Sequence, residues 1–269
     1  MTMEQQAADL RGEGEALNEL LETLAPEDWM RATPFKDWTV NTVMQHLHQG
    51  DWMKVLTMKD SDAYLAAATS RRAARERNDG SSGLEEHGFE VKEGSALREQ
   101  WYAYFQEMCD LMAASDAKRR VKWAGPDMSI RMAATARQME TWAHGQDIYD
   151  LLRRPRIHTD RIKNIAVLGV KTYGWTFANR GEEVPGPQPY VRLTAPSGVL
   201  WDWGDLDDCN KVEGSALEFC QVVTQGRNIA DVNLTVIGTP ATKWMSIAQC
   251  FAGPVNDPPA PGHRAWEVV

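Results

Sequence analysis

Long stretches of helical periodicity in the first 152 residues constrain the fold of this chain more than any other feature. Residues 3–24 contain no proline and repeat leucines at near-heptad spacing, which predicts an amphipathic helix ending near Pro26. A second helix is expected to begin with Thr39 as its N-cap, because apolar residues follow with helical spacing at Val40, Val43, Met44 and Leu47. Further helices are expected over residues 96–114 and from just after Pro126 to Leu152. Four long helices predict a bundle.

The stretch from about residue 70 to residue 92 differs from these helices. It reads RRAARERNDGSSGLEEHG over most of its length and is rich in Arg, Gly, Ser and Glu. We expect a mobile loop or lid here rather than a core element. His87 lies in this stretch, and we expect it to be a solvated loop residue because nothing near it repeats ligand spacing.

The character of the chain changes after a fifth expected helix, residues 159–179. The proline-rich segment VPGPQP follows it and suggests a domain boundary, with a helical domain over 1–182 and a small α+β domain over 188–269. In the second domain we expect a hairpin formed by 190–194 and 199–203, a helix over 215–224, a strand over 234–237 and a helix over 241–252. The predicted fold class is mainly α with an α+β C-terminal part.

Charge and composition exclude several classes of protein. A formal net charge of −9 disfavours nucleic-acid binding, and the basic stretches at 71–77 and 118–122 are short and interrupted. No apolar run approaches the ~18–20 residues of a membrane span, and the first residues do not resemble a signal peptide. The four cysteines form no CxxC pair. We therefore expect a cytoplasmic protein with no nucleic-acid or membrane partner, and the composition is compatible with either a monomer or a homodimer.

Three common motifs can be tested and rejected. The Gly12-Glu13-Gly14 segment has Leu17 where a dinucleotide-binding loop needs its third glycine. The acidic segment WDWGDLDD starts a twelve-residue spacing from Asp202 to Glu213, but the positions between them do not match a calcium loop. There is also no GxSxG motif of the kind found in α/β-hydrolases.

A constellation of histidines and carboxylates on the bundle helices is the remaining candidate site. Glu140 and His144 are four residues apart, so they project from one face of the fourth helix, and Asp147 lies about one further turn along. Small and apolar residues border this strip, which places it toward the bundle interior. One histidine of the second helix, His46 or His48, would complete a set of two imidazoles and one carboxylate that leaves a coordination position open.

Spacing alone leaves two questions open. Glu140 could instead pair with His144 or with Arg137 on the helix surface, with no metal present. Periodicity mildly favours His48 over His46, because His48 lies nearer the stripe that contains Met44 and Leu47.

Two segments of the chain resemble a known family. DWTVNTVMQHL and ARQMETWAHGQDIYDLL are similar to the motifs of the DinB-like metal-binding superfamily, in the branch that contains mycothiol-dependent maleylpyruvate isomerase. The resemblance implies a DinB-like four-helix bundle followed by a small α+β domain. It selects His46, with Glu140 and His144, as metal ligands. A weaker similarity, in LEFCQVVTQGRNIAD, implies that Arg227 reaches toward the active site.

The resemblance also implies a chemistry. The metal is expected to be divalent, with zinc favoured, and to hold a low-molecular-weight thiol such as mycothiol as the thiolate nucleophile. The reaction would be an isomerisation or thiol transfer on a small anionic unsaturated metabolite. Asp147 would orient His144 or handle a proton, and Arg227 would bind a substrate carboxylate. One alternative is a non-catalytic metal- or ligand-binding module, whose metal site would be closed by four protein ligands if His48 joined the other three. The other alternative is a zinc hydrolase.

Overall fold

The protein divides into two compact units in a computed structural model that describes residues 2–77 and 80–264. The first unit is Met1–Ile148 and the second is Tyr149–Val269. This division lies well before the boundary expected at 182–188, because the helices after residue 160 pack with the C-terminal part of the chain. Mainly helical architecture with a small C-terminal sheet confirms the predicted fold class.

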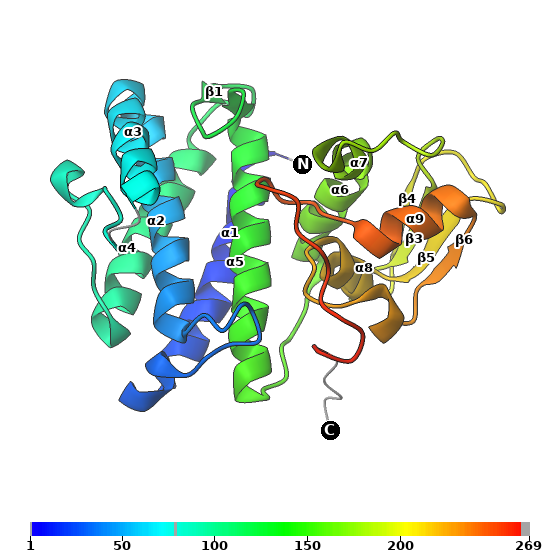
Figure 1. Ribbon diagram of the computed structural model, residues 1–269, viewed down its shortest axis with the longest axis horizontal. Helices are drawn as coiled ribbons and strands as arrows, with labels where there is room; N and C mark the ends of the chain where they lie inside the picture. Colours follow the sequence, from blue (N-terminus) through cyan, green and yellow to red (C-terminus); the bar gives the residue numbers. More distant parts are fainter. Residues whose placement is uncertain (1, 78–79, 265–269) are drawn as a thin grey trace. The chain divides into compact units, whose positions relative to one another are not determined.

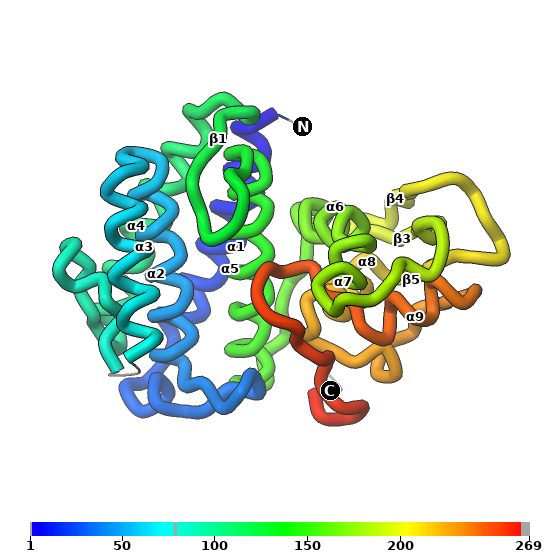
Figure 2. Tube along the Cα trace, turned by 45° about the horizontal axis from the view of Figure 1, so that its top comes forward, coloured from blue at the N-terminus to red at the C-terminus, as the bar shows by residue number. Residues whose placement is uncertain are grey.

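Four long helices form the first unit (Figure 1, Figure 2). They are α1 (Met3–Glu22), α2 (Val40–Lys59), α4 (Gly94–Ala113) and α5 (Ile130–Leu152), whose last turn belongs to the second unit. The predicted N-cap is confirmed, since the Thr39 side chain accepts a hydrogen bond from the Thr42 amide. Shorter elements connect the helices: η1 (Pro26–Met30), η2 (Glu85–His87) and the hairpin of β1 (Arg120–Val121) with β2 (Met128–Ser129).

The bundle core is built from the expected apolar stripes. Helix α4 packs against both α1 and α2, and fully buried side chains from all three helices fill the space between them. Gly14 has a packing role here, because a Cβ atom at this position would lie 2.0 Å from the Phe105 ring. Helix α5 is tied to α1 by a hydrogen bond from Gln6 to Thr135 (2.6 Å).

The expectation of a loop from residue 70 was wrong for its first part. Ser61–Arg77 forms a helix, α3, that packs on α2. Alanine and arginine are good helix formers, so the polar composition reflects an exposed helix face rather than a loop. Residues 78–79 lie outside the described part, and the chain from residue 80 to Glu93 has only the short helix η2.

A four-stranded sheet and several helices form the second unit. The strands are β3 (Tyr190–Thr194), β4 (Leu200–Trp203), β5 (Lys211–Ser215) and β6 (Thr235–Ile237), in the order β4-β3-β5-β6. Strand β3 is parallel to β5, and the other pairs are antiparallel. The helices are η3 (Asp160–Ile162), α6 (Lys163–Lys171), α7 (Tyr173–Arg180), α8 (Ala216–Val223), η4 (Ile229–Asp231) and α9 (Thr239–Ile247).

The hairpin, α8 and the strand near residue 235 confirm the predictions for this unit, and three details differ. The expected helix over 159–179 is interrupted at Thr172, whose hydroxyl donates to the carbonyls of Leu168 and Gly169. Strand β5 was not predicted. Helix α9 begins and ends earlier than the expected 241–252.

The two acidic ends of the rejected calcium-loop spacing lie on separate strands. Asp202 of β4 binds Tyr190 and Arg192, and Glu213 of β5 pairs with Lys211 at 3.0 Å. Both carboxylates therefore have protein partners.

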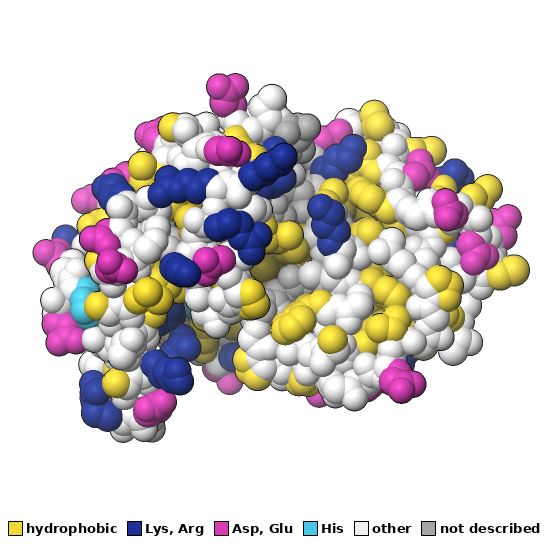
Figure 3. All heavy atoms as spheres, turned by 90° about the horizontal axis from the view of Figure 1, so that it is seen from above, with side chains coloured by type: hydrophobic (Ala, Val, Ile, Leu, Met, Phe, Trp, Pro, Cys, Tyr) yellow, Lys and Arg dark blue, Asp and Glu magenta, His cyan; other side chains and the backbone are white. Residues whose placement is uncertain are grey.

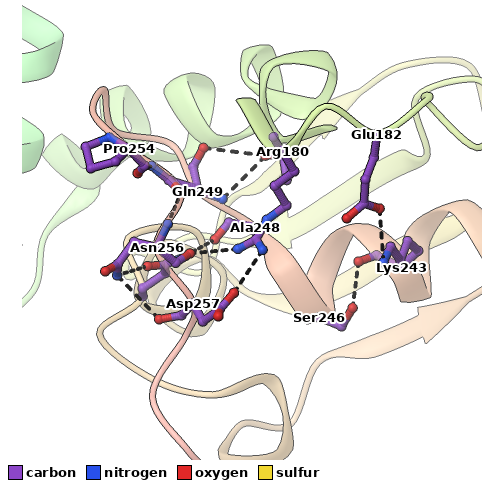
Figure 4. A network of polar contacts seen from close by, with 11 residues as sticks. Arg180, Glu182, Lys243, Ser246, Ala248, Gln249, Pro254, Asn256 and Asp257 are labelled. Atoms are coloured by element: carbon purple, nitrogen blue, oxygen red, sulfur yellow. Dashed lines mark hydrogen bonds and ion pairs between the residues drawn. The ribbon is translucent and has the colours of Figure 1, made fainter. Parts of the chain in front are cut away.

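A polar network fastens the C-terminal segment of the second unit (Figure 4). Arg180 donates to the Asp257 carboxylate (2.8 Å) and to the Asn256 carbonyl (2.7 Å). Gln249 accepts from the Asn256 amide and donates to the Pro254 carbonyl. These bonds replace regular secondary structure in a proline-rich stretch that has few backbone partners of its own.

Surface charge is mixed rather than segregated. On the face shown in Figure 3, Lys and Arg side chains of the helical unit alternate with Asp and Glu. No helix of the described residues is long and apolar enough to cross a membrane. Of the four cysteines, Cys109, Cys220 and Cys250 are buried and Cys209 is exposed.

Candidate metal centre

Three side chains from two bundle helices meet in the first unit. His46 lies on α2, and Glu140 and His144 lie one turn apart on α5; one ligand atom from each lies within 4.8 Å of the others. His46 Nε2 is 3.1 Å from Glu140 Oε2, and His144 Nε2 is 3.6 Å from the same oxygen. The sequence placed these residues on facing helices, and the structure brings them together.

Asp147 lies behind His144, one turn further along α5. Its Oδ2 is 3.2 Å from His144 Nδ1, and the carboxylate is almost fully buried. A carboxylate on one ring nitrogen orients the imidazole and directs the other nitrogen outward, as carboxylates commonly do for metal-ligating histidines. His144 is therefore held with Nε2 facing Glu140 and His46.

Electrostatics favour the protonation states that a metal requires. Burial lowers the pKa of His46 below its ordinary value, and the hydrogen bond with Glu140 only partly opposes this. Burial alone would raise the pKa of Glu140, but the bond to His46 and the positive charges of His144, His46 and Arg137 lower it to about 2. A carboxylate and a neutral imidazole are the forms that bind metal ions.

Two aromatic side chains wall the site, and the sequence did not predict this role. The Trp38 ring stacks on His144 (centroids 6.0 Å apart, planes at 16°) and also lies near His46 (5.4 Å), while Phe35 meets His144 edge-on (4.9 Å). They are presented by a tight loop that includes Lys36 and Asp37 in left-handed conformation. This loop closes through the bond from the Thr33 amide to the Trp38 carbonyl (2.7 Å).

The alternative pairing of Arg137 with Glu140 is not formed. Arg137 Nε instead donates to Asp51 of α2 at 2.7 Å, and the Trp101 indole donates to the same carboxylate at 2.9 Å. Gly50 makes room for this pair, since a Cβ there would lie 2.5 Å from Arg137 Nη1. The pair is buried beside the site and fixes α2 against α5.

His48 does not join the cluster, although it is only two residues from His46. Its ring is fully buried between Phe89 (centroids 4.9 Å apart) and Tyr104 (5.4 Å), on another side of α2. Neither ring nitrogen has a hydrogen-bond partner. A closed set of four protein ligands that includes His48 is therefore not formed among the described residues.

The other two residues that the sequence singled out are not members of the ligand cluster. Arg227, in the second unit, makes two bonds to the buried Asp150 carboxylate (2.7 and 2.9 Å), and its contact with substrate stays a prediction. His87 is half-buried against Ser70 of α3, with 2.9 Å between Nε2 and the hydroxyl oxygen, so it is less exposed than the solvated loop residue that was expected.

The donor set suits a divalent cation such as zinc. Two imidazole nitrogens and one carboxylate oxygen are typical of catalytic zinc sites, in which a water or substrate takes the remaining position. The buried Asp147 supplies the outer-shell partner that such sites use. His46 and Glu140 are half-buried rather than enclosed, so a further ligand can reach the cluster.

Comparisons with known proteins agree with this geometry. The family model described as the mycothiol maleylpyruvate isomerase N-terminal domain matches residues 10–149. Two uncharacterized proteins of Mycobacterium tuberculosis, from strains CDC 1551 and H37Rv, are each 34% identical over 249 residues, which cover 92% of this chain and 95% of theirs.

The fold is also found among solved structures. The crystal structure of the mycothiol-dependent maleylpyruvate isomerase is similar with a TM-score of 0.53 at 14% identity, over 82% of this chain and 88% of that one. A histidine-to-alanine variant of that enzyme gives a TM-score of 0.52 at 13% identity, with the same coverage. At such low identity these two matches show the fold alone. The matched family model, which covers more than half of the chain, places the protein in the family of the mycothiol maleylpyruvate isomerase N-terminal domain.

Proposed function

We propose that this protein is a zinc-dependent cytoplasmic enzyme that uses a low-molecular-weight thiol, such as mycothiol, to isomerise a small anionic unsaturated metabolite. The observation that carries the proposal is the cluster of His46, Glu140 and His144, whose ligand atoms lie within 4.8 Å of one another. A divalent metal bound there supplies a Lewis acid that keeps a thiol in its thiolate form at neutral pH.

The protein's own residues have distinct roles in this proposal. Asp147 keeps the His144 ring turned with Nε2 toward the cluster, and the Asp51–Arg137 pair holds α2 in position. Trp38 and Phe35 cover the imidazoles and keep bulk water from that side. A thiolate held against this apolar wall would lose part of its hydration shell, which would raise its nucleophilicity.

Arg227 remains the candidate for binding a carboxylate of the substrate. Its Nη1 and Nη2 are both bound to Asp150, which fixes the direction of the guanidinium. If this role is correct, Arg227→Lys raises KM for an anionic substrate more than it lowers kcat.

The test is a cis–trans isomerisation assay with zinc-loaded protein. Maleylpyruvate, the substrate named for the similar enzyme, is the first compound to try, with mycothiol present or omitted. We expect turnover that requires the thiol and is lost in His144→Ala but kept in His87→Ala, since His87 lies at Ser70 and not at the ligand cluster.

Two results would contradict the proposal. One is isomerisation that proceeds unchanged when the thiol is omitted, because the thiol would then take no part in the reaction. The other is a folded, zinc-loaded protein that neither binds mycothiol nor turns over any unsaturated acid, which would favour a non-catalytic metal-binding module.

A further inference from the structure

A separate polar cavity of about 240 Å³ lies in the helical unit between α2, α3 and the segment that follows α3. Its polar lining includes Gln45 and Gln49 of α2, Arg71 and Arg75 of α3, and the serines Ser81 and Ser82. His46 lies between the two glutamines in sequence but is bonded to Glu140. The cavity therefore uses a different side of α2 from the metal ligands.

Helical spacing concentrates positive charge in this cavity. Arg71 and Arg75 are four residues apart, so both guanidiniums project from the same side of α3. Like charges at this spacing repel each other unless an anion lies between them. Glu85 also lines the cavity, and its Oε1 already accepts bonds from the Ser82 amide and hydroxyl. Two guanidiniums against one carboxylate leave a net charge of +1.

Arg71, which is half-buried, differs in its partner from the buried Arg137 and Arg227. Arg137 is paired with Asp51 at 2.7 Å, and Arg227 with Asp150 at 2.7 Å. Arg71 donates to a neutral acceptor, the Gln49 side-chain oxygen, at 3.3 Å. Among the residues the structure describes, neither Arg71 nor Arg75 has a carboxylate within ion-pair distance.

The surroundings of Arg71 disfavour the charged form of its side chain. Burial first, and then the positive charge of Arg75, lower the pKa of Arg71 to about 10. The next residue, Arg72, is exposed and has Glu76 at 3.4 Å. Within the described part of the chain, Arg71 thus has no carboxylate partner, and it faces an open, polar cavity.

We propose that this cavity binds the oxyanion group, carboxylate or phosphate, of a small molecule. Arg71 makes the charge-paired contact, because a guanidinium presents parallel N–H groups that match two oxygens of either group. Arg75 supplies the second charge, and the side-chain amide of Gln49 lies beside Arg71 in the lining of the cavity. The site does not depend on the proposed function, since it contains none of the metal ligands.

The test is calorimetric titration of the full-length protein with inorganic phosphate and, separately, with malonate, at constant ionic strength set by sodium chloride. We expect saturable binding of at least one anion at one site per chain, and the stronger of the two identifies the chemical class. Arg71→Gln should weaken binding by about tenfold or more, because it removes a charge-assisted pair. Arg72→Gln, at the exposed neighbour, should leave it within about twofold.

Two controls keep the result interpretable. Binding should persist after a chelator removes metal, which separates this site from the ligand cluster. If Arg71→Gln does not fold, Arg75→Gln gives the same test on a more exposed residue. The proposal is overturned if neither anion binds saturably, if binding disappears with the metal, or if folded Arg71→Gln or Arg75→Gln binds as tightly as Arg72→Gln.

Discussion

Two sides of helix α2 carry histidines only two residues apart, and the two histidines have opposite surroundings. His46 is half-buried and faces a carboxylate and a second imidazole. His48 is fully buried among Phe89, Tyr104 and their neighbours, and its nitrogens have no partners. Burial lowers the pKa of both rings. The partners, rather than burial, decide which of the two can serve as a ligand.

The largest effect that separates the two sides should be on metal affinity. His46→Ala is expected to weaken zinc binding by more than the ~100-fold upper range of an outer-shell change, because it removes a direct ligand. His48→Ala should change the affinity by much less, since its ring lies outside the cluster. Competition with a chromophoric chelator measures both. Equal losses would show that His48 is a ligand and that the separation of the two sides is wrong.

The buried ion pair beneath the His46 side gives the next largest effect. Arg137→Met leaves the fully buried Asp51 carboxylate without its charge partner and should lower the free energy of unfolding by about 3–5 kcal/mol. Arg72→Met, in the exposed pair with Glu76, should cost less than about 1 kcal/mol. Urea denaturation measures both values. A small loss for Arg137→Met would mean that the pair does not hold α2 against α5.

The burial of His48 should make the folded protein less stable in acid. The pKa of His48 is lowered to about 4 in the folded protein, mainly by burial, from an ordinary value of 6.5. Between these two values the unfolded chain binds a proton that the folded protein does not, so stability falls as pH falls from about 6.5 to 4, by up to about 3 kcal/mol. His48→Leu should lack this contribution.

Denaturation curves of wild type and His48→Leu at pH 7 and pH 4.5 test that expectation. Between pH 7 and pH 4.5, the unfolding free energy of wild type should fall by more than that of His48→Leu. His87→Leu, at a half-buried surface position, serves as the control. If the difference is the same at both pH values, the pKa of His48 is not lowered in the folded protein and the expectation is wrong.

The smallest effect concerns the orientation of His144. Asp147→Ala should weaken zinc binding by about 10- to 100-fold, because the ring loses the carboxylate on Nδ1. Asp147→Asn keeps an acceptor of the same shape and should lie at the low end of that range. Asp110→Asn, on the surface of α4, is the matched control. Unchanged affinity in Asp147→Ala would mean that packing alone orients His144.

The elements that could be predicted from the sequence are those specified by local patterns. The leucine spacing of α1 and the Thr39 cap of α2 are such patterns, and both are found. Helix α3 was taken for a loop because its exposed face is polar, although its alanines and arginines favour a helix. Strand β5 was missed because only one of its five residues, Val212, is buried, so its sequence shows no apolar alternation.

The candidate site likewise contains some residues that a local pattern predicts and others that depend on tertiary packing. The spacing of Glu140 and His144 is a local property of α5, and it was predictable. The choice between His46 and His48 depends on the rotation of α2 in the bundle. Periodicity mildly favoured His48, whereas the family motif selected His46, the histidine that lies in the cluster. The aromatic wall of Phe35 and Trp38 depends on how a loop folds back over α5, and the residue pattern held no signal for that contact.

The central claim is that His46, Glu140 and His144 hold one metal ion with a position left open for a thiol. Absorption spectroscopy of the cobalt-substituted protein during titration with mycothiol tests it most directly, because thiolate coordination adds an intense sulfur-to-cobalt charge-transfer band. We expect a d–d spectrum that is lost in His144→Ala, and a new near-ultraviolet band that saturates at one thiol per cobalt. A bound cobalt whose spectrum the thiol leaves unchanged would contradict the account.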